Sequence, residues 1–148
     1  MTRLRHPSCL LLAFALSACS TISTFDQAAY ASVTSLKVDT LNLVAAATGN
    51  YSEHTKEITD LNTRLAKAYE YDRGRPLNQR TMQLWDQLLT ETPSDPDSGV
   101  LPHFLELWKA EGAVSAAAIN GRNGRPGEKA RIGQAFDKII ALESGKNK

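Results

Sequence analysis

Residues 24–48 read TFDQAAYASVTSLKVDTLNLVAAAT and form the longest stretch of helical periodicity in the chain. Apolar side chains recur there every three or four positions, which is typical of a helix with one buried face. Ser23 and Asp26 resemble a capping box at the start, with an acid in place of the usual Glu or Gln. Gly49 and Asn50 are typical of a helix end. The apolar stripe comprises Phe25, Ala29, Val33, Leu36, Leu43 and Ala47.

Further helices are predicted downstream, because apolar residues keep the same spacing between breaks rich in glycine and proline. The alternating β-branched and aromatic runs that indicate strands are absent. We therefore expect an all-α fold, a small antiparallel helical bundle over residues 24–144 with a frayed tail at 145–148. About five helices are expected, over residues 24–48, 52–71, 76–90, 102–119 and 128–143. The expected core comprises Trp85, Trp108, Phe104 and Phe136 with Leu36, Leu61, Leu65 and Ile139.

Two segments of the chain resemble each other. Gly74-Arg75-Pro76 and Gly124-Arg125-Pro126 lie 50 positions apart, and each separates two expected helices. One hypothesis is therefore that two related helical hairpins pack behind the leading helix. The alternative is that amphipathic hairpins share a 3.6-residue period and Gly-Pro breaks without any duplication.

The N-terminus combines positive charge with a short apolar run. Arg3 and Arg5 precede LLLAFALSA at residues 10–18, which is too short for a membrane-spanning helix of about 20 residues. The run ends in Leu16-Ser17-Ala18-Cys19, where small residues precede a cysteine. A cleaved signal is therefore the better interpretation.

These first 20 residues resemble the signal peptide of bacterial lipoproteins. The resemblance implies that the Cys19 thiol takes up a diacylglyceryl group and that residues 1–18 are then removed. Cys19 would become the first mature residue, followed by a short tether over residues 19–23 and anchored in membrane lipid. Ser20 after the cysteine implies sorting to the outer membrane, with the domain facing the periplasm. The alternative is an ordinary signal peptide cut nearby.

Charge limits the class of partner. The chain holds 17 Lys and Arg against 16 Asp and Glu, and residues 1–18 contain two of the arginines and no acid, so the mature chain has a net charge of −1. This balance and the expected compartment argue against a nucleic-acid partner. From residue 120 to 148 seven bases face three acids, which makes the C-terminal part a candidate for an anionic partner. A solvated helix face explains the same counts.

We expect no catalytic residue, no metal and no cofactor. His54 and Glu57 stand at i and i+3, as do His103 and Glu106, but a helical metal site needs more inward carboxylates than the sequence offers. No G-x-S-x-G or phosphate-binding loop is present.

The candidate ligand-binding residues are the arginines of the two helix–helix turns: Arg73, Arg75, Arg122 and Arg125. Their forked guanidinium groups suit carboxylates and phosphates. If the two hairpins pack side by side, the four side chains gather at one end of the bundle. The alternative is that each arginine decorates a turn or pairs with Asp72 or Glu70.

We therefore expect a non-enzymatic binding or scaffolding lipoprotein, whose partner is an envelope protein or an anionic component of the cell wall. An inhibitor or exclusion factor against a toxin, a lysozyme or a phage component is the first alternative. An enzyme acting on the cell wall is the second.

Overall fold

The computed structural model describes residues 22–95 and 98–147. The described part is all-α, as predicted, and contains no β-strand. Its elements are α1 (Gln27–Ala46), a 3-10 turn η1 (Tyr51–Glu53), α2 (Thr55–Arg73), α3 (Gln79–Leu89), α4 (Val100–Glu111), α5 (Ala116–Asn120) and α6 (Glu128–Gly145).

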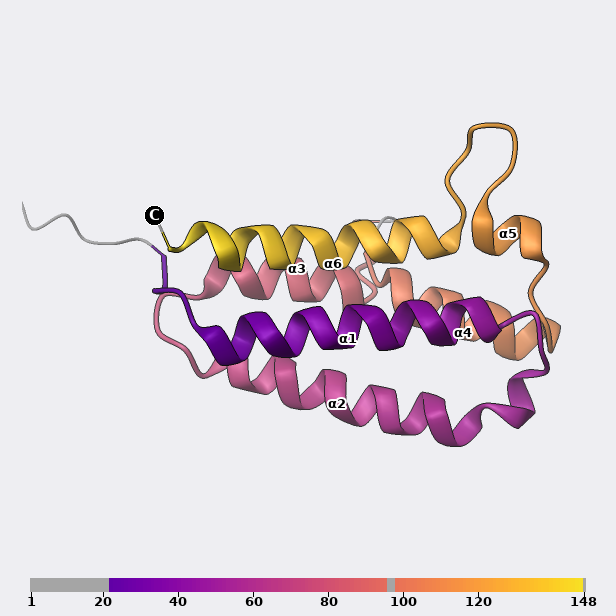
Figure 1. Ribbon diagram of the computed structural model, residues 1–148, viewed down its shortest axis with the longest axis horizontal. Helices are drawn as coiled ribbons and strands as arrows, with labels where there is room; N and C mark the ends of the chain where they lie inside the picture. Colours follow the sequence, from indigo (N-terminus) through magenta and orange to yellow (C-terminus); the bar gives the residue numbers. More distant parts are fainter. Residues whose placement is uncertain (1–21, 96–97, 148) are drawn as a thin grey trace, which may run out of the picture.

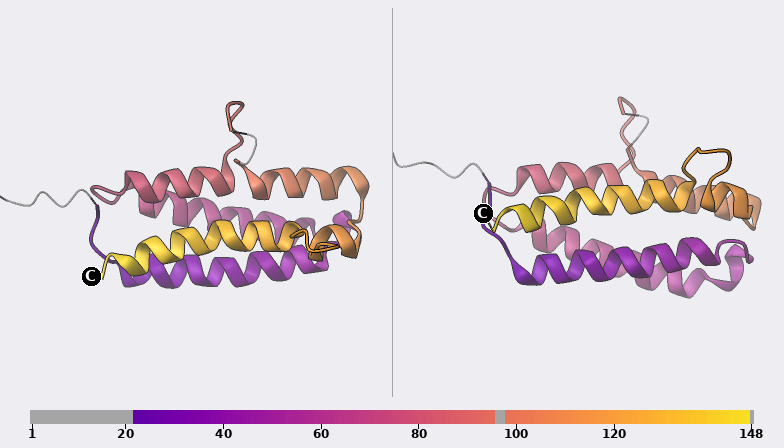
Figure 2. Two further views of the ribbon diagram at one scale, coloured as in Figure 1. Left: turned by 90° about the horizontal axis from the view of Figure 1, so that it is seen from above. Right: turned by 45° about the horizontal axis from the view of Figure 1, so that its top comes forward.

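The helices lie along the long axis of the molecule (Figure 1). The chain follows α1 to the far end, returns along α2, runs out again along α3 and α4, and returns along α6. Figure 2 shows α3 and α4 lying end to end. α1 packs against α2 and α6, and α6 also contacts α3, α4 and α5. The described chain therefore starts and finishes at the same end, which we call the terminal end: residues 22–26, the turn 74–78 and residues 143–147.

The core is the one that the sequence predicts. Trp85, Trp108, Phe104 and Phe136 are completely buried, and the ring of Trp85 meets that of Phe136 edge-on at 6.5 Å between centroids. The four aliphatic residues predicted with them, Leu36, Leu61, Leu65 and Ile139, are buried too. Each such side chain stabilises the fold by roughly 1.5–3 kcal/mol through burial, so this cluster is the main cohesive contact between the helices.

The start of α1 differs from the prediction. Asp26 alone is the cap, because its carboxylate accepts the backbone N–H groups of Ala28 and Ala29 at 2.8 and 2.9 Å. Ser23 lies outside the helix and bonds elsewhere, as described below. α1 therefore begins at Gln27, three residues later than expected.

The helix expected over 102–119 is wrong as a single helix, because the chain breaks at Gly112. Gly112 has a φ of +77°, a left-handed conformation that costs glycine little and ends α4. Its carbonyl accepts the N–H of Tyr51, and the N–H of Val114 donates to Ala47. The segment after α4 is thus bound to the α1–α2 connection, and a separate short helix, α5, follows.

The turn between α2 and α3 is longer than expected. Pro76 does not open the third helix, which begins only at Gln79. Between them Leu77 adopts a φ of +57°, which is uncommon for a residue with a branched side chain. Leu77 is 46% exposed.

Candidate functional site

Cys19, the predicted lipidation site, lies outside the described residues. Ser23, four positions later, is firmly held at the terminal end. Its N–H donates to the carbonyl of Leu77 at 2.9 Å, and its hydroxyl donates to Oδ1 of Asn78 at 2.7 Å. Ser23 is itself buried. The described part of the chain is therefore fixed to the helices at its second residue.

Arg75 lies in a buried ion-pair network. One guanidinium nitrogen donates to Asp72 at 2.8 Å, and the group also binds both carboxylate oxygens of Glu143 and the carbonyl of Thr24. Burial alone lowers the pKa of Arg75, but its hydrogen bonds to Glu143 and Asp72 outweigh burial and hold that pKa above its ordinary value. Asp72 also accepts the indole N–H of Trp85 at 2.7 Å. Arg75 therefore joins three parts of the chain and is a structural residue.

Glu143 and Lys146 complete this network. Glu143 accepts the N–H of Asp26 at 2.8 Å, and the ammonium of Lys146 donates to Glu143, Asn78 and Thr81. The side chain of Lys146 is fully buried, so the expected frayed tail is wrong at this residue. Burial raises the pKa of Glu143, but hydrogen bonds from Arg75 and Lys146 outweigh it and hold the pKa below its ordinary value. Glu143 and Lys146 are thus part of the fold.

Arg73 is exposed beside this network. It forms an ion pair with Glu70, one helical turn earlier, at 2.7 Å. Both side chains are more than half exposed, so the pair contributes little to stability. Arg73 therefore follows the alternative interpretation of the sequence, in which it pairs with Glu70.

Arg122 and Arg125 stand on a two-residue hairpin between α5 and α6, which we call the arginine hairpin (residues 121–127). Asn123 and Gly124 form its tip with φ values of +54° and +75°, as in a type I′ turn. The two arginines exchange both backbone hydrogen bonds across it, at 3.2 and 3.0 Å. Directly opposed residues of this kind have Cα atoms about 5.5 Å apart and side chains on one face. The turn therefore places the two arginine side chains next to each other where they leave the backbone.

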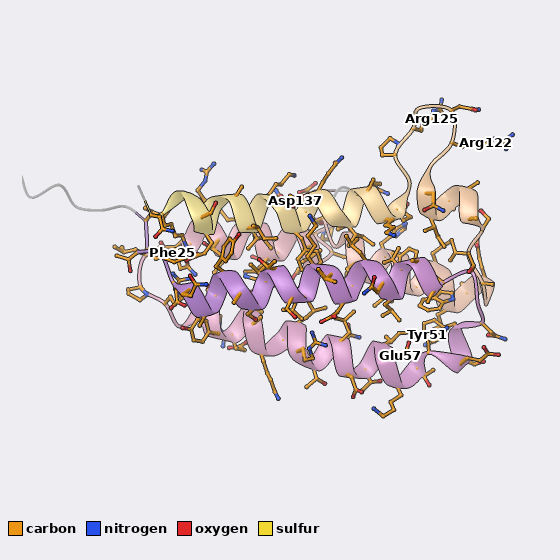
Figure 3. The ribbon with its side chains drawn as sticks, in the orientation of Figure 1. Phe25, Tyr51, Glu57, Arg122, Arg125 and Asp137 are labelled. Carbon is orange, nitrogen blue, oxygen red and sulfur yellow. The ribbon has the colours of Figure 1, made fainter. Side chains whose placement is uncertain are left out.

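The two arginines are free to meet a ligand. Both are exposed, and within residues 22–95 and 98–147 neither side chain forms a hydrogen bond or an ion pair. Figure 3 shows both extending away from the helices on a hairpin that projects from the molecule. Two adjacent unpaired cations are a suitable site for a carboxylate or a phosphate, which each guanidinium can grip with two parallel hydrogen bonds.

The base of the arginine hairpin is closed by backbone. Gly121 has a φ of +86°, and a Cβ there would lie 2.2 Å from the carbonyl oxygen of Arg125. A Cβ at Gly127 would lie 2.3 Å from the nitrogen of Gly121. Two glycines are needed because the two strands of the loop meet without side chains between them. This contact fixes the direction in which the hairpin leaves the domain.

The structure does not bring the four predicted arginines together. Arg75 bonds Glu143 near the C-terminus of α6, whereas Arg122 and Arg125 precede its N-terminus. The two Gly-Arg-Pro turns also differ, since Gly74 is in the right-handed helical region and Gly124 in the left-handed one. The expectation of matched turns at one end is therefore wrong, and the resemblance of the two segments does not extend to their turns.

The two histidine pairs considered for a metal have different surroundings. His54 bonds Glu57 at 2.8 Å and packs its ring against Trp108 at 5.3 Å between centroids. His103 is exposed in the first turns of α4. Among the described residues no group of three or more His, Cys, Asp or Glu side chains is placed to hold a metal ion.

A groove of about 410 Å³ runs between α1 and α2. Leu36, Ala68 and Trp85 line its floor, and Arg64 and Lys67 are also among its lining residues. Arg64 is paired with Asp39. The lining residues include serines but no histidine, so a serine–histidine pair does not form there.

No protein-family model, curated protein or solved structure matches the chain significantly.

Sequence reasoning missed the buried network of Asn78, Glu143 and Lys146. Glu143 and Lys146 are three positions apart beside Gly145, a spacing that reads equally well as a solvated pair at a helix end. The network depends on three segments that are distant in sequence. A local sequence pattern does not predict contacts between such segments.

Proposed function

We propose that this chain is a non-enzymatic binding or scaffolding lipoprotein, anchored in the bacterial outer membrane by acyl chains on Cys19 and facing the periplasm. In this proposal Arg122 and Arg125 bind an anionic group on an envelope protein or on the cell wall. The observation that carries the proposal is the arginine hairpin, with its two exposed, unpaired guanidinium groups on a turn fixed by backbone geometry.

Anchorage is supported by the lipoprotein-like sequence Leu16-Ser17-Ala18-Cys19. None of the helices in the described part of the chain is long and apolar enough to cross a membrane. Two or three acyl chains hold a protein stably on a bilayer without such a helix, since each buried CH₂ contributes about 0.8 kcal/mol.

The two functional ends would be separated by the length of the domain. Ser23 is fixed four residues after Cys19, a distance of at most ~14 Å along an extended chain. α6 then spans 18 residues, or ~27 Å, from the terminal end to the arginine hairpin. We propose that the helices act as one small antiparallel bundle, a rigid spacer between membrane and ligand.

Rigidity and charge explain how two exposed arginines could suffice. A flexible loop pays for ordering when it binds, whereas a preformed type I′ turn has already been ordered by folding. Placing two like charges together without a partner is unfavourable in the free protein, and an anionic ligand removes that repulsion.

The proposal is tested by cross-linking in intact cells. A photoreactive residue at Asn123, between the two arginines, should capture a partner in the wild-type background. The double variant Arg122→Glu/Arg125→Glu should lose that product, because the two glutamates would repel the anionic group of the partner. The matched control is Lys109→Glu/Lys138→Glu, which reverses two exposed lysines on α4 and α6 and should leave the product unchanged.

Two outcomes would contradict the proposal. Equal capture by wild type and by the arginine double variant would remove the site, and mass spectrometry that finds the Cys19 sulfur unmodified in membrane extracts would remove the anchor. Capture that appears only when cells are challenged with a toxin, a lysozyme or phage would favour the inhibitor reading over a scaffold.

A further inference from the structure

Two of the exposed large apolar residues of this domain lie at the terminal end. Among the described residues three such residues stand out: Val38, Tyr71 and Leu77, with exposed fractions of 54%, 49% and 46%. Two of the three lie at the terminal end. The hydroxyl of Tyr71 donates to Asp26 at 2.8 Å, and the carbonyl of Leu77 accepts the N–H of Ser23. The partly exposed ring of Phe25 lies at the same end (Figure 3).

Packing inside the domain does not account for Leu77. Its left-handed backbone suits glycine or asparagine, and a leucine there is strained. Burial gives little stabilisation in return, since the residue is nearly half exposed. A leucine at this position is explained if its side chain is covered by something outside the domain.

The electrostatics of this end suit an anionic surface. Arg80, three positions after Leu77, is exposed and has no ion-pair partner in the described part of the chain. The acids nearby are already engaged: Asp72 and Glu143 are buried with Arg75, and Asp26 caps α1. Exposed cations near anionic lipid attract its headgroups, and aromatic side chains favour the same interfacial depth.

The position of Cys19 decides between possible coverings. It stands four residues before Ser23, whose backbone is bonded to Leu77 itself. We propose that the terminal end is a membrane-docking surface, in which Leu77, Phe25 and Tyr71 enter the headgroup layer of a phospholipid leaflet and Arg80 meets lipid phosphates. The inference rests on the proposed acylation of Cys19. It adds an orientation, because docking at this end leaves the arginine hairpin at the opposite end of the domain, far from the bilayer.

An environment-sensitive fluorophore tests the docking. The acylated protein is labelled at Gln79→Cys, an exposed position next to this surface, and reconstituted at low density in vesicles of phosphatidylethanolamine and phosphatidylglycerol. Cys19 in thioether linkage offers no competing thiol. We expect a blue-shifted emission that a lipid-borne quencher suppresses. The same fluorophore at Val38→Cys or Asn123→Cys should report water, because these positions lie on the side and at the far end.

A second variant separates docking from folding. Leu77→Gly relieves the left-handed backbone and should not reduce the resistance of the domain to urea, yet it should shift the Gln79 fluorophore toward water. If the protein floats with the vesicles but the fluorophore emits as in water at positions 38, 79 and 123, the docking surface is overturned and the anchor is not. Failure to float, with an unmodified Cys19 by mass, overturns the anchor instead. A blue shift at position 79 that grows with protein density would show that a second copy covers this surface, and it would also overturn the proposal.

Discussion

Glu143 is the residue at which both ends of the described chain meet. It accepts hydrogen bonds from the backbone of Asp26, from Arg75 in the α2–α3 turn and from Lys146 after α6. Three donors around one buried carboxylate replace the water that it loses on folding. Buried charges in such a network tolerate the loss of a partner poorly, because the remaining charge is left without compensation.

The charge of Glu143 should make stability depend on pH. Its pKa is lowered in the folded protein from an ordinary value of 4.5, so its contribution is complete above that value and is lost as the pH falls through the folded pKa. Glu143→Gln should cost about 3–5 kcal/mol at pH 7, and the gap to wild type should narrow below pH 4.5. Urea unfolding measured from pH 7 to pH 3 checks this.

Asp137→Asn is the control for that experiment. Asp137 pairs with Lys37 on the surface and is more than half exposed, so its loss should cost no more than about 1 kcal/mol. If Glu143→Gln lowers the unfolding free energy by the same amount at pH 7 and at pH 3, the shape of Glu143, and not its charge, accounts for its role.

The burial of single residues was predictable from the sequence where apolar side chains recur at the helical period of 3.6 residues. The eight predicted core residues are buried because bulky apolar side chains at helical spacing have no better place than the interior. Glu143 and Lys146 carry charges that usually face water, and only the arrival of Arg75 and Asn78 from another segment makes their burial favourable. The same contacts between distant segments make Arg75 a structural residue, although its residue type and its position in a turn suggested a binding residue.

At the scale of elements, the arginine hairpin depends on its two flanking glycines. Gly121→Ala should place a Cβ against the carbonyl of Arg125 in a backbone conformation that alanine avoids, at a cost of about 1–3 kcal/mol. We expect faster amide exchange at Arg122 and Arg125, measured by hydrogen–deuterium exchange, and weaker capture of the partner although both arginines remain.

Gly145→Ala is the matched control. A Cβ at Gly145, the last residue of α6, meets no atom within 4 Å, and alanine suits a helix better than glycine. Its exchange at the hairpin should equal that of wild type. Unchanged exchange in Gly121→Ala as well would contradict the view that the closed base orders the hairpin.

Elements were predictable in type but less so in their limits. Helical spacing continues from Leu107 through Ala118, and the sequence alone favours one helix there. Gly112 ends α4 because Tyr51 and Val114 gain hydrogen bonds when the chain turns, and these bonds depend on the neighbouring α1–α2 connection. Tertiary contacts thus override a local preference that is weak in alanine-rich sequence.

At the scale of the whole molecule, the terminal end holds the helices together through Lys146. Ending the chain after Gly145 removes a buried ammonium from Glu143, Asn78 and Thr81, and we expect a loss of about 3 kcal/mol in unfolding free energy. Chemical denaturation checks it. A chain that ends after Lys146 should retain most of the stability, and equal stability of the two truncations would contradict the role of the ammonium.

The meeting of both ends of the described chain at the terminal end also limits where a tag can be attached. A fluorescent protein fused at the C-terminus would follow closely on Lys146, which bonds Asn78 beside Ser23 and Leu77, and would come between the domain and any surface that covers this end. Loss of partner capture in such a fusion would then say nothing about Arg122 and Arg125 at the opposite end. A small epitope inserted within residues 92–95, in the part of the chain after α3 that projects from the side of the molecule (Figure 2), would report abundance while leaving both ends of the domain clear.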